Sequence, residues 1–118
     1  MKSESTVRDG LLFLFENYKD DRSEFLRHFS TEFTMWKDGV TTNLDDLIAH
    51  FANLQASAPN RSIHFVDMVA SETLVFEQHT VTVRRAESIE QVDVFAKWTV
   101  RNGRITACEE LTRRRPSV

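Results

Sequence analysis

The sequence has 118 residues, of which 41% are hydrophobic, and a formal net charge of −3, so it predicts one globular domain over 1–118 with a sizeable core. The acidic balance argues against a nucleic-acid partner, and we expect the basic run 113–115 to belong to a flexible tail at 113–118. No apolar run reaches the roughly 18 residues of a membrane helix, and the residues after Met1 lack the apolar centre of an export signal. The single cysteine, Cys108, excludes an internal disulfide, so we expect a cytoplasmic protein without a membrane partner.

The chain opens with the apolar period of two helices. Residues 6–18 predict an amphipathic helix whose apolar stripe comprises Val7, Leu11, Leu14, Phe15 and Tyr18. Asp21, followed three residues later by Glu24, resembles a capping box. This pair predicts a short second helix that ends near Phe29.

A strand and a third helix follow. Residues 33–36 predict a strand, which the turn at 37–39 ends because Asp-Gly is typical of turns. The apolar stripe over 43–55 predicts a helix. One of two pairs caps this helix, Thr42 with Asp45 or Asn43 with Asp46.

After Pro59 the chain is rich in β-branched and aromatic residues and predicts four strands, over 61–70, 73–84, 87–101 and 104–113. Their short connections require antiparallel pairing. The apolar parity changes between Phe76 and Val81, so we expect a bulge near Gln78-His79. Helices followed by strands predict an α+β fold, with helices on one face of a curved, mainly antiparallel sheet.

Asn102-Gly103 predicts a two-residue hairpin loop between the last two strands, because both turn residues tolerate positive φ. A regular register then pairs Val100 with Ile105 and Ala96 with Glu109. In that register one face is apolar except for Glu109. The face comprises Val94, Ala96, Trp98, Val100, Ile105, Ala107, Glu109 and Leu111.

Glu109 is therefore the most informative candidate for chemistry. Burial against Val94 and Trp98 would raise its pKa, because desolvation penalises the charged form, and a neutral carboxyl group can donate a proton. The alternative is an ion pair with an arginine at the rim of the sheet.

The four histidines form no pair at metal-ligand spacing along the chain. Glu77 and His79 share one strand face, where they could form an acid–base pair, two metal ligands or a surface pair. Two ligands without a third do not predict a metal site. Cys108 has no neighbouring group on its strand that would lower its pKa, so we expect an inert thiol.

Nearly the whole chain resembles the nuclear transport factor 2-like superfamily, in particular its SnoaL-like and ketosteroid-isomerase-like branch. The resemblance is carried by the two opening helices, by HFSTEFTMWKDG at 28–39, by the helix at 43–55 and by QVDVFAKWTVRNGRITACEEL at 91–111. It implies an α+β cone whose pocket lies between the sheet and the helices. It also implies a homodimer, which an exposed mixed sheet face bearing Phe95, and Phe65 or Val66, likewise indicates.

In the ketosteroid isomerases a tyrosine, a carboxylate base and a protonated acid line this pocket. The matching positions hold Phe13, Lys37 and Ala96, so none of the three family residues is present. The resemblance then implies a cofactor-free acid–base enzyme, such as an isomerase, dehydratase or cyclase, for a small apolar or polyketide- or steroid-like compound. Its expected catalytic residues are Glu109 as acid, Asp38 as base and Tyr18 as an orienting hydroxyl. Its expected substrate-binding residues are Trp36, Trp98, Phe13 and Lys37.

Each of these side chains also has an ordinary structural interpretation. Asp38 before Gly39 is typical of a turn, Trp36 and Trp98 are typical of a core, and a tyrosine such as Tyr18 is typical of a core edge. The alternative to an enzyme is a ligand-binding or dimerisation module without chemistry, which the missing isomerase residues favour.

Overall fold

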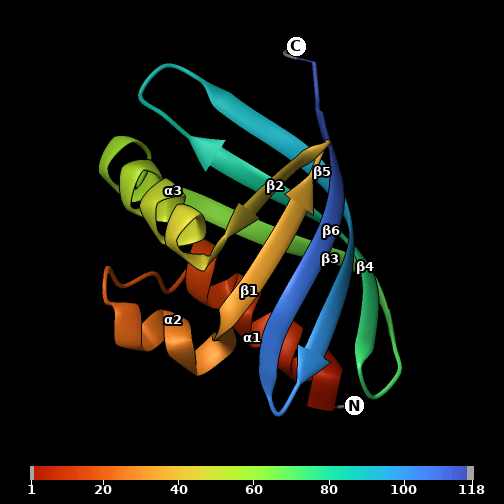
Figure 1. Ribbon diagram of the computed structural model, residues 1–118. Coiled ribbons are helices and arrows are strands. Elements are labelled where there is room, and N and C mark those ends of the chain that lie inside the picture. Colours follow the sequence, from red (N-terminus) through yellow and green to blue (C-terminus); the bar gives the residue numbers. More distant parts are fainter. Residues whose placement is uncertain (1, 117–118) are drawn as a thin grey trace.

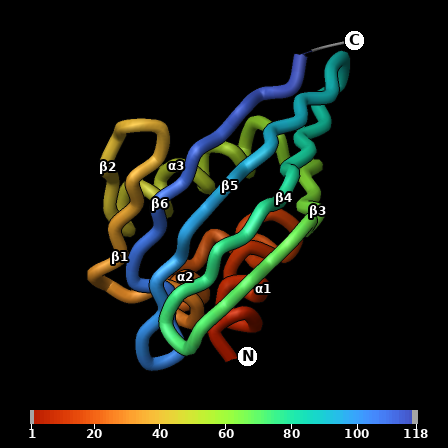
Figure 2. Tube along the Cα trace, turned by 90° about the vertical axis from the view of Figure 1, so that its right-hand side faces the viewer, coloured from red at the N-terminus to blue at the C-terminus, as the bar shows by residue number. Residues whose placement is uncertain are grey.

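The computed structural model describes residues 2–116, which form helices packed on one side of a six-stranded curved sheet (Figures 1 and 2). The strand order is β2-β1-β6-β5-β4-β3, and the β1–β6 pair is parallel while the other pairs are antiparallel. This arrangement confirms the predicted α+β fold. None of the helices within 2–116 has the length and apolar character needed to cross a membrane. The elements are α1 (Lys2–Phe15), α2 (Arg22–His28), β1 (Phe29–Lys37), β2 (Val40–Asn43), α3 (Leu44–Ser57), β3 (Asn60–Ala70), β4 (Leu74–Arg84), β5 (Ile89–Arg101) and β6 (Arg104–Arg114).

Helices α2 and α3 begin where the sequence supplies caps. The Asp21 side chain accepts a hydrogen bond from the backbone N–H of Ser23 at the start of α2. At α3 the capping box is Asn43 with Asp46, so the second of the two predicted pairs is confirmed. α1 lies close against β6, because a Cβ added at Gly10 would stand 2.9 Å from Cδ1 of Ile105.

The four-residue strand β2 was not predicted. It pairs with β1 through the tight turn at Asp38-Gly39, where both residues have positive φ, 49° and 92°. On its other edge β1 pairs with β6, so the last strand in sequence order lies inside the sheet between β1 and β5.

We call the side of the sheet that faces the helices the inner side and the opposite side the outer side. The inner side holds most of the core, including Phe33, Val75, Val94, Trp98, Val100 and Ile105. The bulge predicted in β4 is instead in β3, at Val66, opposite Gln78 and His79. β4 itself alternates regularly against β5, and the parity change has another cause, because Phe76 lies exposed on the outer side.

The predicted register of the last hairpin is wrong beyond its first two pairs. Val100 pairs with Ile105 as expected, but the next pair is Thr99 with Ala107, so Thr106 is an extra residue in β6. From there onward every β6 side chain points to the side opposite to the predicted one.

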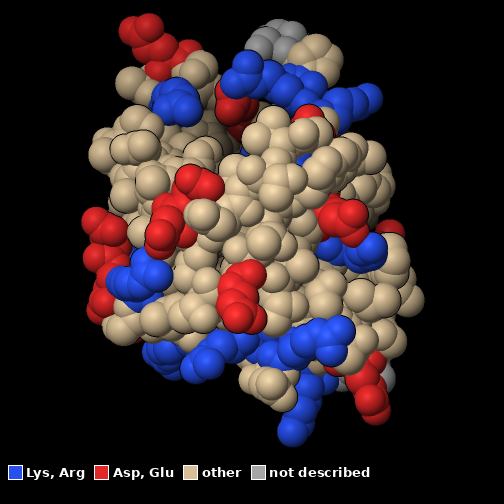
Figure 3. Space-filling model, viewed as in Figure 1, with Lys and Arg blue, Asp and Glu red and all other residues tan. Residues whose placement is uncertain are grey.

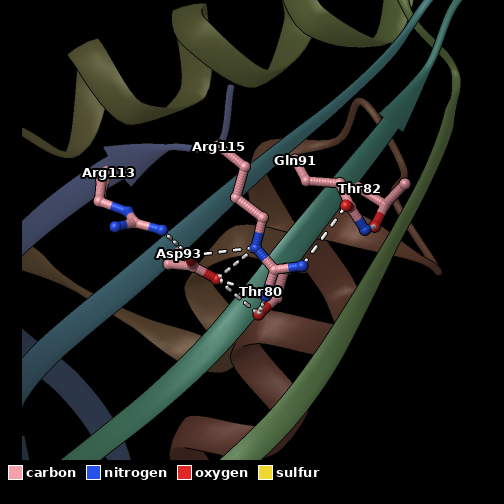
Figure 4. Close-up of polar contacts among 6 residues, drawn as sticks. All are labelled: Thr80, Thr82, Gln91, Asp93, Arg113 and Arg115. Carbon is pink, nitrogen blue, oxygen red and sulfur yellow. Dashed lines mark hydrogen bonds and ion pairs between the residues drawn. The ribbon is translucent and has the colours of Figure 1, made fainter. Parts of the chain in front are cut away.

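The prediction of a tail at 113–118 is wrong for 113–115. β6 continues to Arg114, and the backbone N–H of Arg115 donates to the carbonyl of Gln91. Arg113 and Arg115 both converge on the carboxylate of Asp93, with Thr80 beside it (Figure 4). Residues 117–118 lie outside the described residues.

Candidate functional site

Three buried side chains form a hydrogen-bonded cluster on the inner side of β4 and β5. Nδ1 of His79 lies 2.7 and 2.9 Å from the two carboxyl oxygens of Glu77. The indole Nε1–H of Trp98 donates to Oε2 of Glu77 at 2.9 Å. The side chains of Glu77 and His79 are 0% and 2% exposed, so this polar cluster is enclosed by protein.

The alternation of β4 and the small size of Ala96 create this cluster. Glu77 and His79 are two residues apart on one strand, so both point to the inner side. The residue opposite Glu77 on β5 is Ala96, whose methyl group leaves room for the diagonal neighbour Trp98 to reach the carboxyl group. The rings of Phe15 and Phe65 lie near the imidazole ring of His79, each with its centroid 6.4 Å from that of the imidazole.

Glu110 is a second buried acid on the same side. It lies opposite Ala96 on β5 and beside Lys37 on β1. Its side chain makes no hydrogen bond to any residue of 2–116. Burial raises the pKa of Glu110, and the charge of Glu77 raises it further, while the charges of Lys37 and His79 lower it.

Some polar side-chain atoms of this region have no hydrogen-bond partner. Among residues 2–116, Nε of Arg61 is the one side-chain nitrogen or oxygen that is both fully enclosed and without a hydrogen-bond partner. Nε2 of His79 and the carboxyl oxygens of Glu110 also have no hydrogen-bond partner among residues 2–116, and the two residues are 2% and 9% exposed. They are the polar atoms on this side that remain free to form a further hydrogen bond.

These groups can transfer protons. A carboxyl group bonded to Nδ1 of a histidine fixes which ring nitrogen carries the proton and leaves Nε2 to exchange one. A carboxyl group whose pKa is raised can hold a proton and donate it. Among residues 2–116 no three His, Cys, Asp or Glu side chains gather closely enough to hold a metal ion.

Glu109 lies outside this region, because the extra residue Thr106 turns it to the outer side. Its carboxylate forms an ion pair with Lys97 at 2.5 Å, and its side chain is 55% exposed. The expected burial of Glu109 is therefore wrong, and an ion pair is present, with a lysine in place of the expected arginine. Glu110 occupies the inner position opposite Ala96 instead.

Asp38 and Tyr18 also make other contacts. The Asp38 carboxylate accepts hydrogen bonds from the backbone N–H and the hydroxyl of Thr112, which lower its pKa. The Tyr18 hydroxyl donates to Asp20 at 3.4 Å, and its ring packs on Phe13 and Phe25. Neither side chain contacts Glu77 or His79.

The four expected substrate-binding residues lie in different places. Trp98 is buried and bonded to Glu77, and Lys37 lies beside Glu110 at the end of β1. Trp36 is 39% exposed, and Phe13 is a core residue packed on Phe25 and His28. The structure thus places Trp98 in the buried cluster and the exposed Lys37 next to Glu110.

The outer side carries an apolar groove of about 520 Å³ over β3 to β6. Its exposed apolar side chains are Val69, Phe76, Phe95 and Leu111, and the Lys97–Glu109 pair borders them. Figure 3 shows Lys and Arg gathered beside the C-terminus and at the opposite end of the face in view, with separate patches of Asp and Glu on the surface between.

Comparisons with known proteins agree with this architecture. A family model for the SnoaL-like domain matches residues 15–108. An NTF2-like protein from Anabaena variabilis superposes with a TM-score of 0.76 at 15% identity, over 95% of this chain and 90% of the other. No curated protein matches the chain in sequence.

Two further structures are similar in fold. A candidate polyketide cyclase from Acidithiobacillus ferrooxidans has a TM-score of 0.77 at 11% identity, over 95% of this chain and 88% of the other. An LEH-like epoxide hydrolase from M. tuberculosis has a TM-score of 0.70 at 11% identity, over 92% and 84%. The helices on a curved sheet and the family match over most of the sequence show that this chain belongs to the SnoaL-like domain family of the nuclear transport factor 2-like superfamily.

Proposed function

We propose that this protein is a small-molecule enzyme that performs a cofactor-free acid–base step on the inner side of its sheet. In this proposal Nε2 of His79 takes a proton from the substrate, and Glu110 gives its own proton to an oxygen of the substrate. The observation that carries the proposal is the buried Glu77–His79 pair on the same side of the sheet as Glu110. Glu110 thereby replaces Glu109 as the proposed acid, and His79 replaces Asp38 as the proposed base.

The stability of the fold does not by itself explain why these three ionisable side chains are buried. Burying ionisable groups is unfavourable unless they are paired, and even a paired buried set seldom stabilises a fold more than apolar side chains of the same shape. Glu77, His79 and Glu110 are all at most 9% exposed. Catalytic sites typically place buried titratable groups side by side, one acting as an acid and another as a base.

The surroundings favour a small apolar substrate. Phe15, Phe51 and Phe65 lie around the inner cluster, so a bound molecule would contact mainly aromatic carbon beside two polar groups. The neighbours that are a candidate polyketide cyclase and an epoxide hydrolase support a carbonyl compound or an epoxide. A polyketide- or steroid-like ketone fits both requirements.

The test is turnover and proton exchange on a defined panel of β-keto esters, β,γ-unsaturated cyclic ketones and aryl epoxides. Exchange of the hydrogen next to the carbonyl for deuterium, followed by NMR, detects proton abstraction even without net product. We expect His79→Gln and Glu110→Gln each to lose about 100-fold or more in rate, while Glu109→Gln keeps the wild-type rate. Equal rates in all four proteins would exclude the proposed roles.

The outer groove supports a second candidate, a dimerisation module in which two copies pair through this face. Each copy offers apolar side chains at the centre and both Lys97 and Glu109 at the border, so a two-fold related copy can match charge with charge. Phe95→Glu should then shift the protein from dimer to monomer in sedimentation velocity. Val40→Glu, at a residue of similar exposure on β2, serves as the control and should leave the assembly unchanged.

A further inference from the structure

Trp98 does more than line the inner side, because the indole N–H, its one polar group, is hydrogen-bonded to Glu77 of the Glu77–His79 pair. The ring is 1% exposed, and its Nε1–H donates to Oε2 of Glu77 at 2.9 Å. An indole N–H can only donate, so this bond requires an acceptor at that oxygen and fixes where the oxygen lies.

The same carboxyl group carries two tasks. Its Oε1 is the nearer partner of Nδ1 of His79, at 2.7 Å, and Oε2 lies at 2.9 Å from the same nitrogen. Without the indole, the terminal torsion of a glutamate is broad, and the carboxyl plane can turn. With the indole in place, the carboxyl group has two partners, Trp98 at Oε2 and His79 at both oxygens.

We propose that Trp98 is a positioning residue that acts through Glu77, holding the carboxyl group so that His79 keeps its proton on Nδ1 and presents Nε2 for proton exchange. The inference rests on the proposed function only for its catalytic consequence. The arrangement of the three side chains can be tested without any substrate.

The small residue opposite Glu77 is part of this arrangement. Trp98 reaches Glu77 diagonally across β4 and β5, past the methyl group of Ala96. A larger side chain at that position would occupy the space between the indole and the carboxyl group. The sequence signal is thus an Ala-x-Trp pattern on one strand facing a Glu-x-His pattern on its neighbour.

The first experiment measures the tautomer of His79 by ¹⁵N NMR of the full chain, in the wild type and in Trp98→Phe, which keeps a ring but removes the N–H. We expect the neutral wild-type ring to hold its proton on Nδ1, and Trp98→Phe to give a mixture in which Nε2 is also protonated. Trp36→Phe is the matched control and should leave His79 unchanged. The same tautomer and the same Nδ1–H shift in Trp98→Phe and wild type would overturn the proposal.

A second measurement covers the case in which Trp98→Phe does not fold. In Glu77→Gln the Trp98 indole N–H proton should move upfield, because it then meets a neutral amide in place of the carboxyl group, while the Trp36 indole signal stays in place. An unmoved Trp98 signal would also overturn the proposal.

Kinetics then separates this inference from the proposed function. If a substrate is turned over, Trp98→Phe should lower kcat about tenfold or more, with little change in KM. If His79→Gln leaves turnover intact while the tautomer still changes in Trp98→Phe, the proposed function fails and the positioning role stands.

Discussion

Glu110 in β6 lies directly opposite Ala96 in β5, and Ala96 lies opposite Glu77 in β4. The two acids therefore share one row of the inner side with a single methyl group between them. At about 4.8 Å per strand, their Cα atoms are roughly 10 Å apart. Within protein of low polarity, the charge of Glu77 disfavours the ionised form of Glu110 and so raises the pKa of Glu110.

Glu110→Gln should change how stability depends on pH. Burial raises the pKa of Glu110 in the folded state, so its contribution is fully present below the unfolded value near 4.5 and is lost as pH rises through the folded pKa. Glu110→Gln lacks this titration, so its free energy of unfolding should increase relative to that of the wild type from pH 4 to pH 8. Urea unfolding across that range measures it, and parallel pH profiles of the two proteins would contradict the prediction.

Glu109→Gln should have little effect by comparison. Glu109 is next to Glu110 in sequence but forms an exposed ion pair with Lys97. Such pairs contribute about 0.5 kcal/mol or less to the free energy of unfolding after solvent screening. We expect a change of that size in the free energy of unfolding. A change of 2 kcal/mol or more would mean that the side chain is buried after all.

Asp38→Asn should destabilise the fold at neutral pH and less so in acid. Hydrogen bonds from Thr112 lower the pKa of Asp38, so its contribution is present above the unfolded value near 3.8 and is lost as pH falls below it. Because the side chain is exposed, we expect about 0.5–1 kcal/mol at pH 7. Denaturant titrations of wild type and Asp38→Asn at pH 7 and pH 3 measure the difference in the free energy of unfolding. An equal loss of stability at the two pH values would argue against hydrogen bonds to an ionised Asp38.

Asn43→Ala should weaken the start of α3. The Asn43 side chain accepts a hydrogen bond from the backbone N–H of Asp46, and the Asp46 side chain accepts one from the backbone N–H of Asn43. Loss of this cap should lower the free energy of unfolding by about 1 kcal/mol. Asp45→Ala is the control, because it removes an exposed pair with Arg22 and a first-turn carboxylate but leaves the capping box in place, and it should change stability by about half as much or less.

Much of the fold could be predicted from the sequence, because helix and strand periods, Asn102-Gly103 and the Asn43 cap are local signals. β2 was missed because four residues leave no readable period. The register of β6 was missed because nothing in the sequence marks Thr106 as the extra residue. Its placement depends on pairing with β5 and β1 together, and both pairings shift there.

The candidate site was predictable only in part. Glu77 and His79 were expected on one strand face, but whether that face is buried depends on helices far away in sequence, which bring Phe15 and Phe51 over it. Glu110 was missed for a simpler reason. The predicted register was wrong by one residue after Ile105. That error assigned Glu109 to the inner side and Glu110 to the outer side, and it reversed the sides of every later residue of β6.

The parallel pairing of β1 with β6 also constrains the route by which the chain folds. Apart from the four-residue β2, β1 has no neighbour in the sheet except β6, about 75 positions further along the chain. A two-stranded hairpin is at best marginally stable alone, so β1 and β2 must wait for β6 before they gain a lasting partner. Closing so long a loop is slow, and until it closes an unpaired strand edge stays open to other chains. Refolding yield should therefore fall as protein concentration rises.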